Sequence, residues 1–262
     1  MERREIMKKI IIVLSVCFLF LSLTSCGSSK DLKDYKNEVS KTDFKSGFDQ
    51  YFNNAFWKND IISKDYVLIM TDNQEVTMYL NGELVKQSTV KYDHKFEYDS
   101  NSGRCNITEK NVYDGVENVN RKYEMQIYND VVYNVFTNGE EDFKKKYSTA
   151  EQFIKDRCSF EGEFLSFYNA SNVGGVSTKF YMDENIFTLV QNSTDIIYGK
   201  EEFILQFVFN KKSIEYIFVR NGDLNFPSMD KFDNRKEHII KKYALYLKEV
   251  KLDSIDVSKY LN

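Results

Sequence analysis

The sequence is poor in the residues and motifs that most often carry catalysis. It has two histidines, His94 and His238, and none of the HExxH, GxSxG or CxxC patterns. We interpret His94, on the apolar face of a predicted strand, as a core or cavity histidine, and we expect His238, in a charged run, to face water. No pair of acidic residues stands out for general acid–base chemistry. The sequence therefore predicts a protein that is not an enzyme and that uses no cofactor or metal.

A surplus of positive charge is also missing. The formal net charge is −4, whereas a nucleic-acid-binding domain usually carries a basic face, so we expect no nucleic-acid partner. Long apolar runs are missing too. The fourteen uncharged residues from Ile10 to Leu23 fall short of the ~18–20 that a membrane-spanning helix requires.

The first thirty residues have the layout of a secretory signal peptide. Basic residues precede the apolar run, and small polar residues follow it. The four residues Leu23-Thr24-Ser25-Cys26 resemble the lipobox of bacterial prolipoproteins. That resemblance implies cleavage before Cys26, a lipid anchor on its sulfur, and a place on the extracytoplasmic face of the cell membrane. The alternative is a soluble secreted protein that is cut nearby, in which Cys26 has no special role.

Cleavage would leave three segments: the signal peptide 1–25, a polar and flexible tether 26–42, and a single α+β domain 43–262. Residues 1–25 carry four basic and two acidic residues, so their removal changes the net charge from −4 to −6. Cys105 and Cys158 would be the cysteines left besides Cys26. Because a disulfide is allowed outside the membrane, they form either a bridge or two separately buried thiols. The sequence leaves both possibilities open.

Apolar spacing predicts the secondary structure. A period of three and four residues predicts helices over 43–57, 149–169 and 229–249. Alternation and turn residues predict strands over 66–70, 75–80, 88–98, 105–113, 121–128, 131–137, 143–147, 176–183, 186–191, 194–198, 202–210, 213–220 and 255–261. Short consecutive strands favour an antiparallel meander, which we expect to curl as an incomplete barrel around a few amphipathic helices.

The order helix, meander, helix, meander resembles the LolA/LppX-like lipoproteins, and segment 123–148, YEMQIYNDVVYNVFTNGEEDFKKKYS, is similar to their strand–turn–strand pattern. In that fold an incomplete barrel wraps around helices and binds acyl chains in an apolar cavity. The resemblance implies a membrane-anchored protein that binds or carries an apolar ligand such as a lipid. The candidate lining residues are Phe48, Phe52, Val90, Tyr92, Phe96, Phe160 and Phe164.

Each of these side chains has an alternative role in ordinary core packing. The competing hypothesis is therefore a structural or protein-interaction lipoprotein of the cell envelope with a filled core. In that hypothesis exposed tyrosines such as Tyr79 and Tyr113 would meet a protein partner.

Overall fold

The computed structural model describes residues 32–54, 61–147, 149–158, 161–170, 175–195, 199–226 and 231–261. One compact unit spans Tyr35–Asn262, and the account below concerns this unit. The expected signal peptide, the lipidation residue Cys26 and the candidate ligand-binding residue Phe160 lie outside the described residues.

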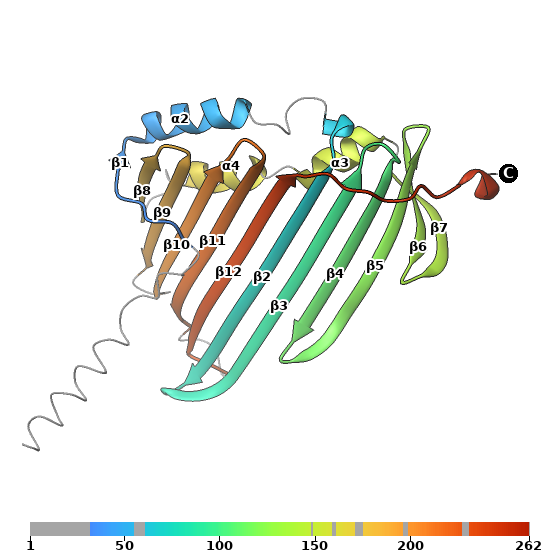
Figure 1. Cartoon of the computed structure of the whole chain (residues 1–262). Helices are drawn as coiled ribbons and strands as arrows, with labels where there is room; N and C mark the ends of the chain where they lie inside the picture. The colour runs from blue at the N-terminus through green and yellow to red at the C-terminus, as the bar shows by residue number, and fades with distance from the viewer. Residues whose placement is uncertain are drawn as a thin grey trace, which may run out of the picture. The chain divides into compact units, whose positions relative to one another are not determined.

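Twelve antiparallel strands form one sheet. Their bounds are β1 Glu38–Val39, β2 Tyr66–Leu80, β3 Glu83–Asp99, β4 Arg104–Tyr113, β5 Val116–Tyr128, β6 Val131–Thr137, β7 Glu140–Tyr147, β8 Val176–Asp183, β9 Ile186–Asp195, β10 Gly199–Phe209, β11 Ser213–Asn225 and β12 Asn234–Leu247. The spatial order is β1-β8-β9-β10-β11-β12-β2-β3-β4-β5-β6-β7. Two meanders, β2–β7 and β8–β12, are thus joined where β12 pairs with β2. Because β1 and β7 are at opposite edges, the sheet is open and mostly antiparallel β, not a closed barrel (Figure 1).

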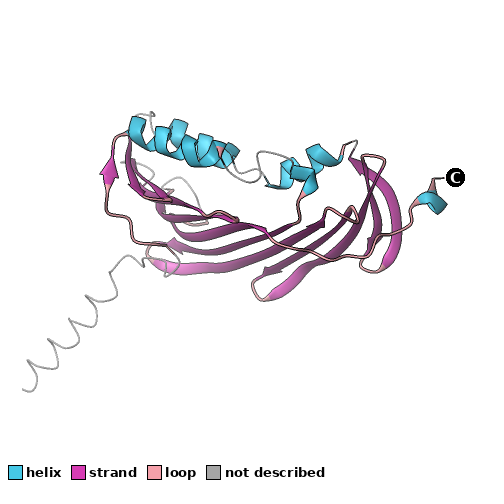
Figure 2. Ribbon diagram, turned by 45° about the horizontal axis from the view of Figure 1, so that its top comes forward, coloured by secondary structure: helices cyan, strands magenta, loops and turns pink. Residues whose placement is uncertain are grey.

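The sheet curves, and the helices lie on its concave side near one end of the strands (Figure 2). They are α2 Lys41–Asn53, α3 Ala150–Cys158 and α4 Glu161–Ala170, with two short 3-10 turns, η1 Ile61–Ser63 and η2 Ser258–Tyr260. Ser40 caps α2, because its hydroxyl accepts a hydrogen bond from the backbone N–H of Asp43. Phe44, Phe48 and Phe52 follow at helical spacing and are buried.

The C-terminal segment lies on the convex face of the sheet, at the same end of the strands as the helices. Tyr98 and Met125 point into the core, so Asp99 and Gln126, one residue further, point away from the helices. Asp99 Oδ2 accepts the N–H of Leu252 at 2.9 Å, and Gln126 Oε1 accepts the N–H of Ile255 at 2.7 Å. The chain after β12 is therefore attached across the strand ends.

The predicted third helix, 229–249, is wrong, because residues 234–247 form strand β12. This strand lies between β11 and β2, with Ile239 and Tyr243 on the core face and Ile240 and Ala244 on the other. Because this segment has apolar residues on both faces, their spacing fits the period of a helix as well as that of a strand. Pairing on both sides fixes the extended form.

Other boundaries also change. Asp72-Asn73, between the predicted strands 66–70 and 75–80, is part of the continuous strand β2, and Asn221-Gly222, beyond the predicted strand 213–220, is part of β11. The predicted helix 149–169 divides into α3 and α4. Residues 35–42 are ordered and do not belong to a flexible tether, since β1 pairs with β8 and α2 begins at Lys41. The predicted strand 255–261 is a loop with one 3-10 turn.

Candidate functional site

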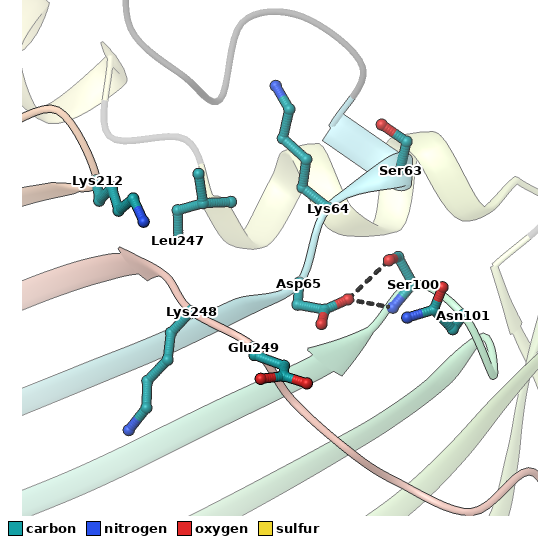
Figure 3. A pocket seen from close by; sticks show the side chains of 9 residues that line it. All are labelled: Ser63, Lys64, Asp65, Ser100, Asn101, Lys212, Leu247, Lys248 and Glu249. Atoms are coloured by element: carbon teal, nitrogen blue, oxygen red, sulfur yellow. Dashed lines mark hydrogen bonds between the residues drawn. The ribbon is translucent and has the colours of Figure 1, made fainter.

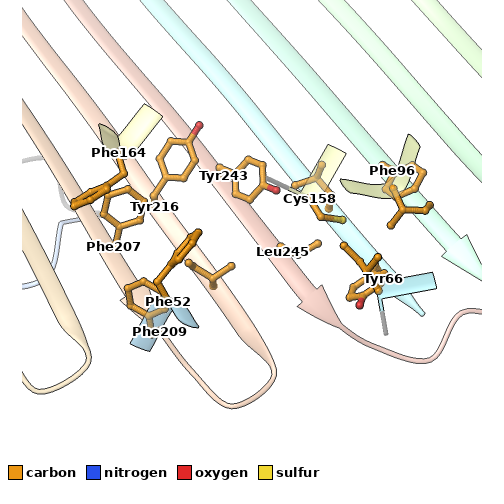
Figure 4. Packing of buried hydrophobic residues seen from close by; sticks show 14 of the residues in the cluster. Phe52, Tyr66, Phe96, Cys158, Phe164, Phe207, Phe209, Tyr216, Tyr243 and Leu245 are labelled. Atoms are coloured by element: carbon orange, nitrogen blue, oxygen red, sulfur yellow. The ribbon is translucent and has the colours of Figure 1, made fainter. Parts of the chain in front are cut away.

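Three of the candidate lining residues are packed together in the core. The rings of Phe48 and Phe164 stack with centroids 3.8 Å apart, and Phe207 and Phe209 contact Phe48 at 5.2 and 5.3 Å. Phe48, Phe52 and Phe164 are all buried (Figure 4 shows the latter two in the cluster). At these separations no acyl chain fits between the rings. These three side chains are packing residues, and the space under α2 and α4 that they occupy is filled.

The other predicted residues lie elsewhere along the sheet. Phe96 is buried beside α3, with its ring 6.0 Å from that of Phe153. Val90 and Tyr92 lie further along β3 toward the β2–β3 turn, six and four residues before Phe96, and are half-buried. The structure therefore does not bring the predicted set together into one cavity.

Beyond the described helices, the concave face carries a row of apolar side chains. We call this region the uncovered half and define it by Val76, Met78, Val90, Tyr92 and Val119, all of which are half-buried. They share a face with the core residues of their own strands, because side chains on a strand alternate with period two.

The convex face of the same strands is different. Lys91, Asp93 and Lys95 alternate with Val90, Tyr92 and His94 on β3, and Lys91 and Lys95 are exposed. Lys91 Nζ pairs with Asp93 Oδ2 at 3.5 Å, and Lys95 Nζ pairs with Glu97 Oε1 at 2.7 Å. From Lys91 to Glu97 on β3 the charged side chains therefore lie on the convex face, whereas Val90 and Tyr92 lie on the concave one.

A polar cluster lies where the helix-covered core meets the uncovered half. The guanidinium of Arg157, at the end of α3, lies 4.4 Å from the ring centroid of Phe153 and 6.0 Å from that of Phe96. Its Nε is buried and has no hydrogen-bond partner in the part of the chain that the structure describes. Among the side chains that the structure describes, no carboxylate forms an ion pair with this guanidinium. Arg157 is thus a cation packed against aromatic rings, with no ion-pair partner among those side chains.

Three more groups from β3 and β4 complete this cluster. His94 Nδ1 lies 3.4 Å from the hydroxyl of Tyr92 and 3.6 Å from Glu109 Oε1. Burial lowers the pKa of His94; Glu109 opposes this effect, and the positive charge of Arg157 adds to it. Burial also raises the pKa of Tyr92. At neutral pH the cluster therefore presents a neutral imidazole, a phenol and a guanidinium.

A second charged network lies on the concave face of β10, β11 and β12. Glu237 is almost fully buried and is paired with Arg235 and with Arg220, the latter at 3.2 Å, and Arg220 also pairs with Glu201. The predicted helix 229–249 would not bring these residues of three strands together, so this network could not be predicted from the sequence. His238 faces the other way, half-buried, with its Nδ1 2.7 Å from Asn221 Oδ1.

The structure has a polar pocket at the strand ends, with a volume of about 350 Å³ (Figure 3). Its lining consists of Ser63, Lys64, Asp65, Ser100, Asn101, Lys212, Leu247, Lys248 and Glu249. Asp65 Oδ1 accepts hydrogen bonds from the N–H and the hydroxyl of Ser100 at 2.8 and 2.7 Å, and so joins β2 to the end of β3. The side chains of Lys64 and Lys248 point away from each other. This arrangement fits a structural junction at the surface better than an apolar ligand site.

Cys105 and Cys158 are both buried free thiols, so of the two arrangements left open by the sequence the structure has the unbridged one. Burial raises the pKa of both, to about 12 for Cys158. Neither thiol has the lowered pKa of a nucleophile. Over the described ranges, no three His, Cys, Asp or Glu side chains are placed to hold a metal ion, and no helix is long and apolar enough to cross a membrane.

No protein-family model and no curated protein matches the sequence. Among solved structures, the chain is similar to a β-barrel-like protein of the domain of unknown function DUF1849 from Brucella abortus, with a TM-score of 0.24 and 8% identity over 72% of this chain and 99% of the other. It is also similar to lipovitellin (TM-score 0.26, 8% identity, 75% and 26%) and to the S-type phycobiliprotein lyase CPES from Guillardia theta (0.19, 8%, 69% and 88%). At such scores these likenesses carry no functional argument.

Proposed function

We propose that the protein is a membrane-anchored extracytoplasmic lipoprotein, not an enzyme, that binds an amphiphilic ligand on the uncovered half of its concave face. The observation that carries this proposal is the set of half-buried apolar side chains there, on a face that also carries charged groups such as Asp72, Glu109 and Glu237. An apolar surface without a covering element marks a binding surface. The filled aromatic cluster argues against a ligand under α2 and α4.

Arg157 favours an anionic head group for this ligand. A guanidinium presents two parallel N–H donors that match a carboxylate or a phosphate. Arg157 has no ion-pair partner among the side chains that the structure describes, and the acid near it, Glu109, lies beside His94. A ligand head at Arg157 would place its acyl chain along Val90 and Val76, where the apolar row begins.

The anchoring part of the proposal rests on the lipobox. Leu23-Thr24-Ser25-Cys26 follows a short apolar run, as it does in prolipoproteins. Two acyl chains on Cys26 would hold the protein stably at a membrane, which is also the source of amphiphiles.

Titration of the full-length protein with a fluorescent single-chain fatty acid tests this function. We expect saturable binding, about tenfold weaker in Arg157→Gln because a charge-assisted bidentate contact is lost. Lys155→Gln is the matched control, since it removes the same charge from an exposed position of α3 and should leave binding unchanged. Lack of binding by the wild type would refute the function, and equal binding by both variants would refute only the role of Arg157.

A second candidate function is protein interaction, and the filled core favours it. Of the two tyrosines expected at such a surface, Tyr113 is exposed and Tyr79 is half-buried, with Lys236 Nζ 5.6 Å from its ring centroid. Crosslinking at the membrane through a cysteine at position 113, followed by purification, should then recover one defined protein partner. Recovery of lipid alone would exclude this candidate.

A further inference from the structure

Two hairpin tips carry a disproportionate share of the exposed apolar side chains. Among the described residues ten large hydrophobic side chains are exposed, and four of them lie at the β2–β3 and β4–β5 tips. We call these four the tip residues: Leu84 (55% exposed), Val85 (49%), Tyr113 (39%) and Val116 (64%). Apolar residues gathered at protruding turns, and not scattered singly, indicate an interaction surface.

Both tips are held in place by the neighbouring strands. Asn81-Gly82 and Asp114-Gly115 have positive φ angles, as two-residue type I′ turns require. The N–H of Asn81 donates to Asp233 Oδ2 at 2.8 Å. The N–H of Thr89 donates to Asp114 Oδ1 at 2.6 Å, and Thr89 O accepts from the N–H of Asp114 at 2.8 Å. The tip residues are thus presented on a preorganised framework.

The two tips are at the same end of the sheet but do not form one continuous patch. Both lie at the end opposite the helices (Figure 1). Pairing of β3 with β4 begins at Val90 and Tyr113. Leu84 is six residues beyond Val90, so the β2–β3 tip projects roughly 20 Å further along its strand.

The separation of the two tips indicates which kind of surface can contact both of them. A stable protein interface buries about 800 Å² on each side, with roughly 20–30 residues, far more than two separate tips provide. A bilayer is an extended surface that can contact both tips, and aliphatic and tyrosine side chains are well suited to its interfacial layer. Lys110 Nζ and Glu117 Oε2, beside the β4–β5 tip, form an ion pair at 2.9 Å, so no surplus of positive charge directs this tip to anionic lipids.

We propose that the β2–β3 and β4–β5 tips insert their apolar side chains into the interfacial layer of a phospholipid bilayer, including one made of zwitterionic lipid. This contact is independent of the ligand site on the uncovered half. It would orient the domain with its strand tips toward the membrane and its helices away from it.

Local quenching tests the proposal. Leu84→Cys and Val116→Cys, labelled with an environment-sensitive fluorophore, are placed in the full-length protein on phosphatidylcholine vesicles that contain a spin-labelled lipid. Lys95→Cys and Thr108→Cys, both exposed on the convex face, are the controls. The native Cys105 and Cys158 are buried and should stay unlabelled.

We expect quenching at the tips to exceed quenching at the controls at least twofold. Equal quenching at all four positions, or none at the tips, would overturn the proposal, as would protection of the tips only when membrane proteins are added. Leu84→Asp and Val116→Asp should reduce vesicle contact but leave fatty-acid titration unchanged. A failure of the tip proposal is thereby separable from a failure of the proposed function.

Discussion

The concave face of the sheet has two regions, and one is packed whereas the other is not. Under α2 and α4, aromatic rings stack at distances down to 3.8 Å and exclude solvent. Further along the sheet, Val76, Val90 and Tyr92 continue the inward-facing rows of β2 and β3 but stay half-buried. The difference teaches that alternation along a strand specifies the face of a side chain, whereas its burial depends on what lies above that face.

Removal of a ring from the packed half should have the largest effect. We expect Phe48→Ala to lower the free energy of unfolding by about 3–5 kcal/mol, because a cavity replaces a fully buried ring. Val90→Ala, in the uncovered half, should cost about 1 kcal/mol or less. Urea unfolding followed by circular dichroism measures both. Similar losses would show that the two halves are equally packed.

The attachment of the C-terminal segment should have the next largest effect. Burial alone would raise the pKa of Asp99, but hydrogen bonds from the backbone of Leu252, Asn101 and Ser102 hold it below its usual range. Asp99→Ala leaves these N–H groups without an acceptor and should cost about 2 kcal/mol. Hydrogen exchange at Leu252 should also accelerate.

Asp253→Ala is the control for this experiment, because Asp253 is exposed in the same segment. Equal exchange rates at Leu252 in the two variants would contradict the attachment.

The effect of pH on stability through His94 should be smaller than the effects of Phe48→Ala and Asp99→Ala. Since the pKa of His94 in the folded protein is lower than its usual 6.5, the folded state binds this proton less readily than the unfolded chain does. His94 therefore contributes to the stability of the folded protein above pH 6.5. This contribution is lost as the pH falls through the pKa that His94 has in the folded protein. The difference between the free energies of unfolding at pH 7.0 and pH 5.5 should be smaller in His94→Asn than in the wild type. An unchanged difference would show that His94 is solvated.

The reactivity of Cys105 and Cys158 should show whether the core around them is closed to solvent, and the wild-type protein serves for this measurement. Because burial raises the pKa of Cys105 and Cys158, neither should react with a water-soluble maleimide at pH 7.5 in the folded protein. Both should react after denaturation. Modification of either thiol in the folded protein would show that this part of the core opens readily.

Strands bounded by tight turns were predictable from the sequence. The bounds of β6 and β8, Val131–Thr137 and Val176–Asp183, equal the predicted ones. Two-residue turns flank β6 on both sides, and a two-residue turn follows β8. The continuous strand β2 was not predictable, because Asp72-Asn73 has the composition of a turn. β12 and β3 pair with this dipeptide on both sides, and Asp72 Oδ2 lies 3.6 Å from Lys241 Nζ. Such pairing is non-local and has no signal within the strand.

The candidate site was predictable only in part. Val90 and Tyr92 were identified by alternation, and the structure places both in the uncovered half. In the sequence, Arg157 lies within the predicted helix 149–169. Its place in the cluster depends on Phe96 and His94, about sixty residues earlier in the chain. Aromatic spacing likewise could not distinguish a cavity lining from a filled core, since both need the same apolar face.

The central claim is that a ligand occupies the uncovered half and not the packed one. A crystal structure of the protein with a fatty acid brominated along its chain tests this most directly, because anomalous scattering locates the bromine atoms. We predict bromine peaks beside Val76 and Val90 and a carboxylate within 3.2 Å of the Arg157 guanidinium. Bromine among Phe48, Phe164 and Phe207, or no ordered bromine at saturating ligand, would contradict the account.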